Sequence, residues 1–539
     1  MMKFRKYLPL CVLVAGALLA TAQTPWRNGE MSPRQKLSAV EAAIANYYVD
    51  TVDEDKLVED AIRGMLENLD PHSSYSNREE TKELTEPLDG NFSGIGIQFN
   101  MQKDTLYVIQ TIAGGPSERV GILPGDRFVE VNDTVIAGVK MKNRDIMKRL
   151  RGPKGTVVNI KVKRRNVPEL LEFRVTRDDI PVYSIDAAYM ADDKTGYIRL
   201  SRFARSSFQE YKDAVKKLKK QGMEQLILDL TDNGGGYLDI AAQLANEFLN
   251  RDELIVYTEG RRRPRTDINA IGNGDFRKGK VVFMVNQLSA SASEILSGAI
   301  QDWDRGVVVG RRTFGKGLVQ QPLDLPDGTM VRLTIARYYT PSGRCIQKPY
   351  KPGDREDYEM DIVDRYKHGE FSNADSIQFA DSLKCYTLKN RRVVYGGGGI
   401  MPDVFVPLDT TEYSDYYRDL VAKGILNQFV LQYVDSTRKE LKAQYPSVDK
   451  FEKDFVVGDD LLKQLTEAGE RDSVKFNEEQ FNVSREMLRT VVKALVARDI
   501  YDMEAYFRIV NRRNNIFTEA LRVINDDKLY KSLLSGEKK

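Results

Sequence analysis

The chain has 539 residues, of which 41% are hydrophobic and 30% are charged, an ordinary composition for a water-soluble globular protein. This length exceeds what one hydrophobic core supports, so about three or four domains are expected. The net charge of +2 at pH 7 gives no electrostatic case for nucleic-acid binding, and we expect no nucleic-acid partner.

The first residues have the pattern of an export signal. Basic residues precede an apolar run from Leu8 to Leu19, and Ala20-Thr21-Ala22 fits the small-x-small cleavage rule. We therefore expect a signal peptide over residues 1–22, cleaved after Ala22, and a protein exported to the periplasm or cell envelope. The apolar run is short for a spanning helix, which favours cleavage over an uncleaved membrane anchor. Export would permit a disulfide between the two remaining cysteines, but two free thiols fit equally well; they are Cys345 and Cys385.

Hydrophobic periodicity divides the rest of the chain into four regions. Two regions with apolar side chains at helical spacing flank a region of short strands and a region of alternating strands and helices. Such alternation argues for an α/β core with parallel strand pairing. The predicted regions are an N-terminal helical region (23–90), a β-rich domain (91–178), an α/β core (179–408) and a C-terminal helical region (409–539).

Individual elements can be placed from the same periodicity. In the β-rich domain a helix over Asn143–Leu150 interrupts the strands. In the α/β core the expected elements, in chain order, are strand 197–200, helix 207–220, strand 226–230, helix 238–249, strand 281–285, helix 292–303 and strand 307–309. Right-handed crossovers place the carboxyl ends of such strands on one rim, together with Ser291 and the glycines that follow Leu230.

Ser291 lies where the apolar strand 281–285 gives way to a helix. Ser291-Ala292-Ser293-Glu294 fits a capping box, so a purely structural cap is the simplest reading. A serine at a helix start also lies at the positive end of the helix dipole, where a developing oxyanion is stabilised. Both roles are compatible.

A serine nucleophile needs a base, and the chain offers only two histidines, His72 and His368. Lys316, between two glycines, is the candidate base, although such a lysine is more often a solvated loop residue. To act at neutral pH its pKa would have to fall by about three units, which burial can achieve. Gln320 lies in a segment that we expect to be extended; it could hold the amine toward Ser291, or could simply be polar at a strand edge. So few histidines and cysteines also make a zinc site improbable, and no metal is expected.

Three glycines, 234–236, follow the buried strand 226–230 and precede a helix. Their backbone N–H groups are unobstructed by side chains, which suits an oxyanion hole with Ala292 N–H as a second donor. A nucleotide-phosphate loop would require a different glycine spacing. A tight turn without a catalytic role is the remaining reading.

Together these stretches resemble the carboxyl-terminal processing proteases, also called tail-specific proteases. The resemblance covers about residues 35–405 and rests on motifs of high specificity. The motifs are Leu69–Tyr75 (an N-terminal signature), Gly94–Phe99 with Gly121–Asp126 (a PDZ domain), 233–236 with Ser289–Ile295 (oxyanion and nucleophile elements), and Thr313–Gln320 with Tyr338–Arg344. Threonine stands at position 231, where the family often has arginine, and Cys345 replaces a common serine.

The resemblance implies a multidomain α/β protein: a crotonase/Clp-protease-like α/β core, an inserted-type β-rich PDZ domain and helical N- and C-terminal regions. It implies Ser291 as nucleophile, Lys316 as general base and Gln320 as the residue that orients Lys316. The oxyanion donors would be Ala292 N–H and the N–H of Gly235, with Gly236 close behind. No metal or organic cofactor is implied.

The implied function is that of an exported serine endopeptidase acting on proteins with accessible C-terminal tails. The PDZ loop, formed by Gly94, Ile95, Gly96 and Ile97, would offer N–H groups to the carboxylate of an unstructured, apolar tail. The alternative is a PDZ scaffold or chaperone that binds C-termini without cutting. The C-terminal helices have no counterpart in the resemblance and could self-associate, bind an adaptor or buttress the core.

Overall fold

The structure is a computed structural model that describes residues 31–102, 104–112 and 114–535. The expected signal peptide lies outside these described residues. The described residues divide into two compact units, one ending at Leu66 and the other beginning at Glu67, which we describe separately. Among the helices described, none combines the length and apolarity that crossing a bilayer requires.

The first unit is helical in its described part. Helix α2 (Pro33–Tyr47) begins with a reciprocal cap, in which Ser32 N–H donates to Gln35 Oε1 (2.9 Å) and Gln35 N–H donates to Ser32 Oγ (3.4 Å). It buries none of its side chains. Helix α3 (Glu54–Glu67) follows and is amphipathic.

The α/β core is built on a six-stranded sheet in the order β10-β11-β12-β15-β16-β21. Strand β10 pairs antiparallel with β11, and all the other neighbours pair in parallel, as the alternation of elements predicts. The bounds are β10 (Ile185–Met190), β11 (Thr195–Leu200), β12 (Gln225–Asp229), β15 (Val281–Val285), β16 (Val307–Gly310) and β21 (Val404–Phe405).

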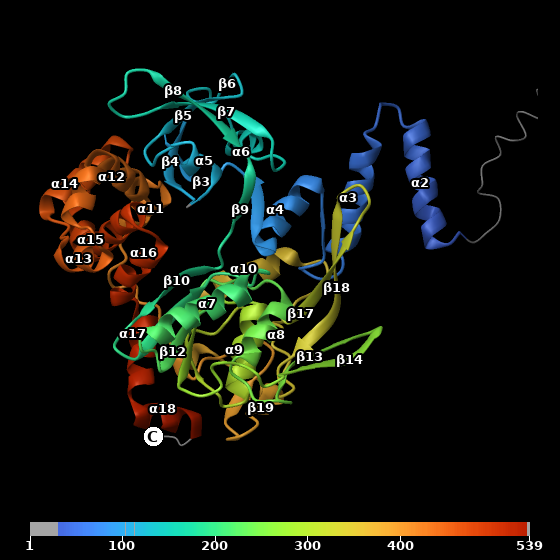
Figure 1. Cartoon of the computed structure of the whole chain (residues 1–539). Coiled ribbons are helices and arrows are strands. Elements are labelled where there is room, and N and C mark those ends of the chain that lie inside the picture. Colours follow the sequence, from blue (N-terminus) through green and yellow to red (C-terminus); the bar gives the residue numbers. More distant parts are fainter. Residues whose placement is uncertain (1–30, 103, 113, 536–539) are drawn as a thin grey trace, which may run out of the picture. The chain divides into compact units, whose positions relative to one another are not determined.

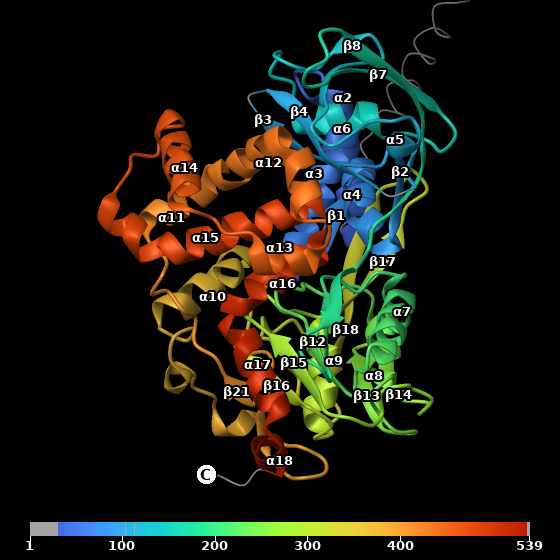
Figure 2. The same ribbon diagram turned by 60° about the vertical axis from the view of Figure 1, so that its left-hand side comes forward.

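Helices cover both faces of this sheet (Figures 1 and 2). Helices α7, α8 and α9 pack on one face, where Leu228, Phe283 and Val308 point. Tyr197 and Met284 point to the other face, against the C-terminal helices α17 and α18. Every strand residue of β15 is therefore buried, as in a sheet covered on both sides. The helix bounds are α7 (Ser207–Lys220), α8 (Leu238–Asn246), α9 (Ala292–Asp302), α17 (Asn515–Asn525) and α18 (Asp527–Ser535).

A second sheet has the order β1-β18-β13-β14, with β17 also paired to β18. The short strand β1 was not anticipated by the helical reading of residues 23–90; it forms because Ser74–Ser76 pairs with β18. Cys345 and Cys385 are free thiols. The bounds are β1 (Ser74–Ser76), β13 (Leu254–Gly260), β14 (Arg263–Asn269), β17 (Leu318–Asp324) and β18 (Met330–Tyr339).

The β-rich domain has its own apolar core and an antiparallel sheet in the order β3-β4-β5-β7-β8, with β6 paired to β5. Its helix α6 (Asn143–Leu150) has the bounds expected from sequence. A short pair of strands, β2 and β9, closes the domain, and helix α4 (Arg78–Asp89) precedes it. The other bounds are β2 (Asn91–Gly94), β3 (Ile97–Gln102), β4 (Thr105–Thr111), α5 (Pro116–Arg119), β5 (Arg127–Val131), β6 (Thr134–Val135), β7 (Val157–Lys163), β8 (Leu170–Thr176) and β9 (Asp178–Pro181).

The C-terminal region is helical, and its first part forms a separate apolar core around Leu420, Val434 and Leu495. Gln110 Nε2 of the β-rich domain donates to Arg498 O (2.5 Å), and Lys217 of α7 forms an ion pair with Glu504 (3.0 Å).

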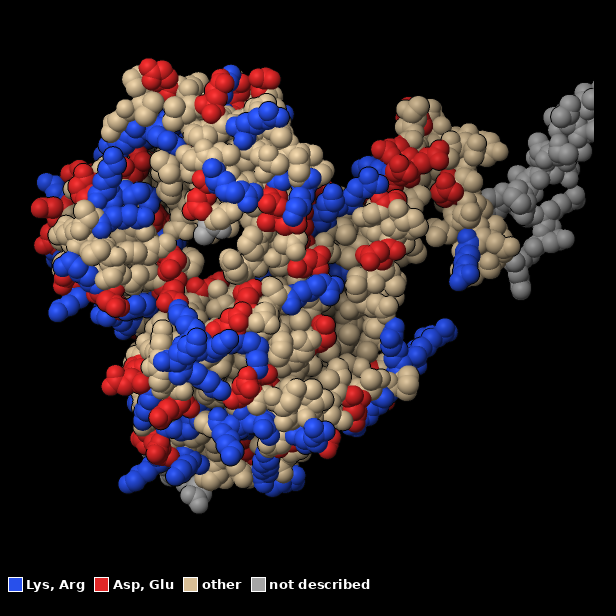
Figure 3. All heavy atoms as spheres, viewed as in Figure 1, with Lys and Arg blue, Asp and Glu red and all other residues tan. Residues whose placement is uncertain are grey.

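Basic and acidic side chains are interspersed over the face drawn in Figure 3. The remaining helices are α10 (Arg355–Lys367), α11 (Asp415–Ala422), α12 (Ile425–Gln444), α13 (Val448–Asp454), α14 (Asp459–Arg471), α15 (Glu478–Ile500) and α16 (Met503–Val510).

Candidate active site

Ser291 occupies a strained turn between strand β15 and helix α9. Its φ of +58° and ψ of −114° lie in a region that non-glycine residues rarely adopt. Such strain persists only where the surrounding structure over-determines it, and it is concentrated at functional sites. The turn presents Ser291 at the start of α9, where Ala292 N–H has no hydrogen-bond acceptor among the described residues.

Two buried side chains fasten the backbones of Ser291 and Lys316 to each other. Glu294 Oε2 accepts hydrogen bonds from Ser291 N–H (2.8 Å) and Lys316 N–H (2.9 Å), while its Oε1 accepts from Thr313 Oγ1 and Gly315 N–H. The hydroxyl of Tyr338 lies within hydrogen-bond distance of the carbonyl oxygens of both Ser291 and Lys316. The turn at Ser291 and the loop at Lys316 are thus held side by side.

The Glu294 carboxyl is completely buried, and burial raises its pKa to about 7 in spite of the hydrogen bonds that favour its charged form. The capping-box reading is therefore incomplete. The acid does reach back to Ser291 N–H, but the same carboxylate also bonds residues 313–316. Helix capping and assembly of the site are functions of one side chain.

Lys316 is half-buried, and burial lowers the pKa of its ammonium to about 8; the nearby charge of Arg332 acts in the same direction, while Glu294 and Asp70 oppose it. Within the described residues no hydrogen bond joins Lys316 Nζ to Ser291 Oγ. Nε2 of His72, in the N-terminal signature, shares a hydrogen bond with Tyr358 Oη (3.0 Å). Burial, and then the charge of Lys316, lower the His72 pKa to about 3, so this imidazole is neutral near pH 7.

Gln320 is anchored to the N-terminal signature by a chain of hydrogen bonds. Its Nε2 donates to Thr334 Oγ1 (3.1 Å), which donates to Asp70 Oδ1 (2.8 Å). Asp70 also accepts from the N–H groups of His72 (2.9 Å) and Ser73 (3.1 Å). In the structure Gln320 therefore contacts Thr334, and within the described residues no hydrogen bond links it to Lys316.

The glycine turn after β12 lies against the nucleophile turn. A Cβ at Gly235 would fall 2.8 Å from Ser291 Cβ and 3.0 Å from Ala292 N, and one at Gly236 would fall 2.2 Å from Phe203 O, so only glycine fits. Gly235 N–H donates to Asn233 Oδ1 (2.8 Å). The N–H expected to serve as an oxyanion donor is thus bonded within its own turn here.

Asn233 is the residue that joins the two turns, and sequence reasoning missed it. Its backbone oxygen accepts from Ala290 N–H (3.0 Å) and Ser293 Oγ (2.9 Å), and its side chain contacts Gly235 N–H and Leu200 O. Asn233 is fully buried. Its position before three glycines is the only sequence signal that could have indicated this role.

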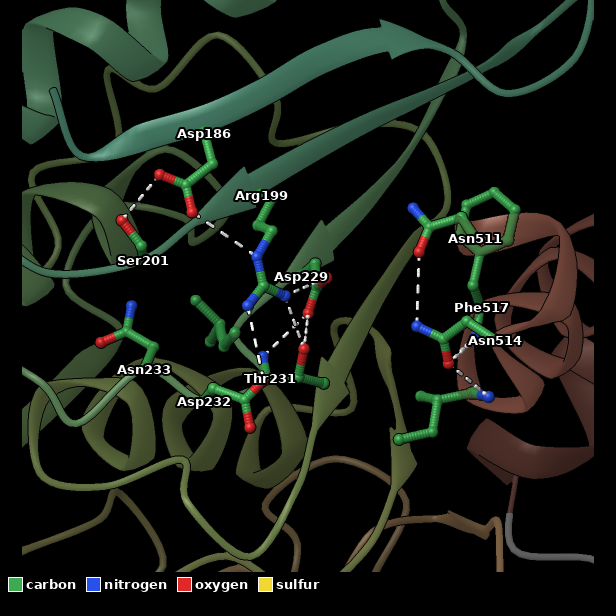
Figure 4. Close-up of polar contacts among 12 residues, drawn as sticks. Asp186, Arg199, Ser201, Asp229, Thr231, Asp232, Asn233, Asn511, Asn514 and Phe517 are labelled. Carbon is green, nitrogen blue, oxygen red and sulfur yellow. Dashed lines mark hydrogen bonds and ion pairs between the residues drawn. The ribbon is translucent and has the colours of Figure 1, made fainter. Parts of the chain in front are cut away.

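An arginine from the neighbouring strand contacts the threonine at position 231. Arg199 lies opposite Asp229 in the β11–β12 register. Its Nη1 donates to Asp229 Oδ2 (2.8 Å) and Thr231 Oγ1 (2.7 Å), as Figure 4 shows. The guanidinium also lies 4.6 Å from the ring centroid of Phe507, on α16. Thr231, where the family often has arginine, therefore lies against a guanidinium that comes from another strand.

The expected PDZ loop borders a cavity of about 310 Å³. Ile95, Gly96 and Ile97 line it from the turn between β2 and β3, and Leu150 and Arg151 line it from the end of α6. Gly94 ends strand β2 beside this turn. A groove between a strand edge and a helix is the arrangement that binds an extended peptide by strand addition.

Comparisons with known proteins identify these regions. Residues 194–359 match peptidase family S41, residues 93–176 match the PDZ domain, and residues 18–81 match the N-terminal domain of the activating protease CtpB. Residues 416–502 match a family of unknown function. The carboxy-terminal-processing protease of Bartonella bacilliformis is 34% identical over 344 residues, which span 62% of this chain and 78% of that protein.

This chain belongs to the carboxy-terminal processing proteases of peptidase family S41. It is therefore a serine-type peptidase that carries a PDZ domain. The processing protease CtpB of Bacillus subtilis is 32% identical over 345 residues, covering 62% of this chain and 69% of that protein. A solved structure, the photosystem II D1 C-terminal processing protease, is 29% identical and covers 59% of this chain and 91% of that chain, with a TM-score of 0.34.

Proposed function

We propose that this protease cuts peptide bonds with a Ser291–Lys316 dyad, that it acts on proteins with accessible C-terminal tails, and that it is exported. The observation that supports the dyad best is the Glu294 carboxylate, which bonds the backbone N–H groups of both residues. The lowered pKa of Lys316 supports it further, because an amine with a pKa of about 8 has an appreciable neutral fraction at neutral pH.

In this mechanism Lys316 Nζ takes the proton of Ser291 Oγ, and Oγ attacks the carbonyl carbon of the scissile bond. The oxyanion is stabilised by Ala292 N–H and by Gly235 N–H, which must first leave Asn233 Oδ1. Collapse of the tetrahedral intermediate expels the amine, which takes a proton from the Lys316 ammonium. Lys316 then activates water, which hydrolyses the acyl-enzyme. Gln320 orients Lys316, which requires its amide to move from Thr334.

The PDZ cavity recruits the tail of the substrate. The turn at Ile95–Ile97 binds the terminal carboxylate, and the apolar walls contributed by Phe99 and Leu150 accept an apolar C-terminal side chain. The substrates are therefore proteins whose C-termini are unstructured and apolar. A tail held in this cavity raises the local concentration of the substrate near the core.

The test is cleavage of an unfolded exported protein by the purified chain. We expect wild type to cut it, and Ser291→Ala and Lys316→Ala to abolish cutting. Lys316→Arg is the sharper variant, because it keeps the positive charge but cannot lose its proton near neutral pH. Lys351→Ala, at an exposed lysine, is the matched control and keeps full activity. Cutting that survives in Ser291→Ala would contradict the dyad.

The same preparation distinguishes the protease from a tail-binding scaffold. A peptide with an apolar C-terminus should bind Ser291→Ala as tightly as wild type, and its C-terminal amide should bind less tightly. Binding without any cleavage by wild type would favour the scaffold. N-terminal sequencing of the mature protein tests export, since cleavage after Ala22 leaves Gln23 as the first residue.

A further inference from the structure

A second cavity, of about 440 Å³, lies at the carboxyl edge of the core sheet. Asp232, Asn286 and Arg311 line it from the loops that follow β12, β15 and β16. Arg513 and Asn515, before and at the start of α17, line its opposite side. Ligands of open α/β sheets bind in the crevice outside the carboxyl ends of the strands. This volume is in the range of small-ligand sites.

Arg311 is a buried cation without an ion-pair partner in the described part of the chain. It is 6% exposed, and among residues 31–102, 104–112 and 114–535 its guanidinium donates only to Gln287 Oε1 (2.9 Å) and Val406 O (3.4 Å). Arg177, which is also buried without an ion pair, donates instead to four protein oxygens. The Arg311 guanidinium therefore has N–H donors that remain available to an anion in the cavity. Such an anion would be favoured, because burying a charge is costly unless it is paired.

The other charges of the cavity are already matched, with one exception. Arg513 pairs with Glu412 and Arg512 pairs with Glu452 (2.5 Å). Asp232 lies 3.5 Å from Arg199, a cation that it shares with Asp229, and its negative charge also favours the charged form of Arg311. The exception is the exposed carboxylate of Asp409, which within the described residues accepts only from Thr411. Those bonds lower its pKa, so it is charged at neutral pH. One cation and one anion that have no ion-pair partner among the described residues therefore line the same cavity.

We propose that this cavity binds a zwitterion, a short peptide or amino acid whose free carboxylate pairs with Arg311 and whose ammonium group pairs with Asp409. The planar guanidinium of arginine matches a carboxylate with two parallel hydrogen bonds. Short peptides are the products of a peptidase, so the source of the ligand rests on the proposed function, whereas its binding does not.

The cavity adjoins the glycine turn through Asp232, which lines the cavity. Asp232 precedes Asn233, and its Oδ1 accepts from Asn286 Nδ2 (2.7 Å), while Asp232 N–H donates to Asn286 Oδ1 (3.0 Å). Figure 4 shows Asp232 and Asn233 beside Arg199, with Asn514 on the C-terminal helices across from them. The ligand therefore contacts the segment that carries the glycine turn, and it lies between the core sheet and the C-terminal helices.

The experiment is calorimetric titration of the full chain with the dipeptide dialanine. We expect saturable binding to one site, and at least tenfold weaker binding of dialanine amide, which lacks the carboxylate, and of N-acetyldialanine, which lacks the ammonium group. Arg311→Gln should weaken dialanine binding at least tenfold. Asp409→Asn, at an exposed position that cannot disturb the core, should also weaken it. Arg205→Gln, an exposed arginine outside the cavity, is the control and should bind as wild type does.

Three results would overturn the proposal: no binding by wild type, equal binding of dialanine and its two blocked forms, or undiminished binding by Asp409→Asn. Inorganic phosphate tests whether the cavity binds any anion. If equimolar phosphate displaces dialanine, the cavity is a site for simple anions and the proposed zwitterion is wrong. Because every readout is binding, these results do not depend on catalysis. If the chain binds dialanine but cuts no substrate, the proposed dyad is refuted and the proposed binding site is not.

Discussion

The dyad makes a quantitative prediction about pH. With a pKa of about 8 for Lys316, about one tenth of the amine is neutral at pH 7, compared with about one part in 3,000 for an ordinary lysine. Between pH 6 and pH 8 the neutral fraction rises about fiftyfold. The neutral amine is the base, so kcat/KM should rise about tenfold per pH unit below the pKa and level off above about pH 8.

The assay is kcat/KM for a fluorogenic tail peptide between pH 5.5 and 9.5, with circular dichroism at each pH to show that the fold persists. His72, with a pKa of about 3, remains neutral over this range and cannot produce the inflection. Glu294 titrates near pH 7, so its contribution must be separated. Its negative charge raises the pKa of Lys316. Any activity that Glu294→Gln retains should therefore have its inflection at lower pH. A profile that is flat from pH 6 to 9, or falls, would refute a neutral-lysine base.

Three substitutions test the supporting contacts. Arg199→Met leaves the buried Asp229 carboxylate without its cation, so urea unfolding should show a loss of about 3–5 kcal/mol; a loss below 1 kcal/mol would mean that the pair contributes little. Thr334→Val removes the hydroxyl between Gln320 and Asp70 and should cost about 1–2 kcal/mol by the same measurement, with no loss expected if water replaces it. Gly235→Ala places a Cβ 2.8 Å from the Cβ of the nucleophile, so kcat should fall by about a hundredfold or more with tail binding unchanged.

The C-terminal helices give a structural account of a region that sequence left open between self-association, adaptor binding and support of the core. Helices α17 and α18 cover the second face of the core sheet, with Phe517 and Ile524 against it. That arrangement favours support of the core. Phe507 on α16 also packs on Arg199, so the helical region reaches a contact that adjoins the glycine turn. Self-association or adaptor binding stays a proposal for the remaining surface.

Periodicity and motif spacing were sufficient for much of the local structure in this chain, although they did not predict the hairpin of β13 and β14. The strand-to-helix step at Ser291, the helix at Asn143–Leu150 and the alternation that produces a parallel sheet all depend on neighbours close in sequence. Helix caps and side-chain alternation are determined within a few residues, so they can be read without a structure. The resemblance to processing proteases rested on such short motifs.

Contacts between distant segments were decided only by the tertiary structure. Glu294 was legible as a helix cap, but that its carboxylate also bonds Lys316 N–H depends on where the loop after β16 returns. Arg199 contacts Asp229 and Thr231 because β11 and β12 pair in one register, and Gln320 bonds Thr334 because β17 pairs with β18. Such partners are set by packing in three dimensions, where a small shift in register changes every neighbour, and sequence spacing carries no record of it.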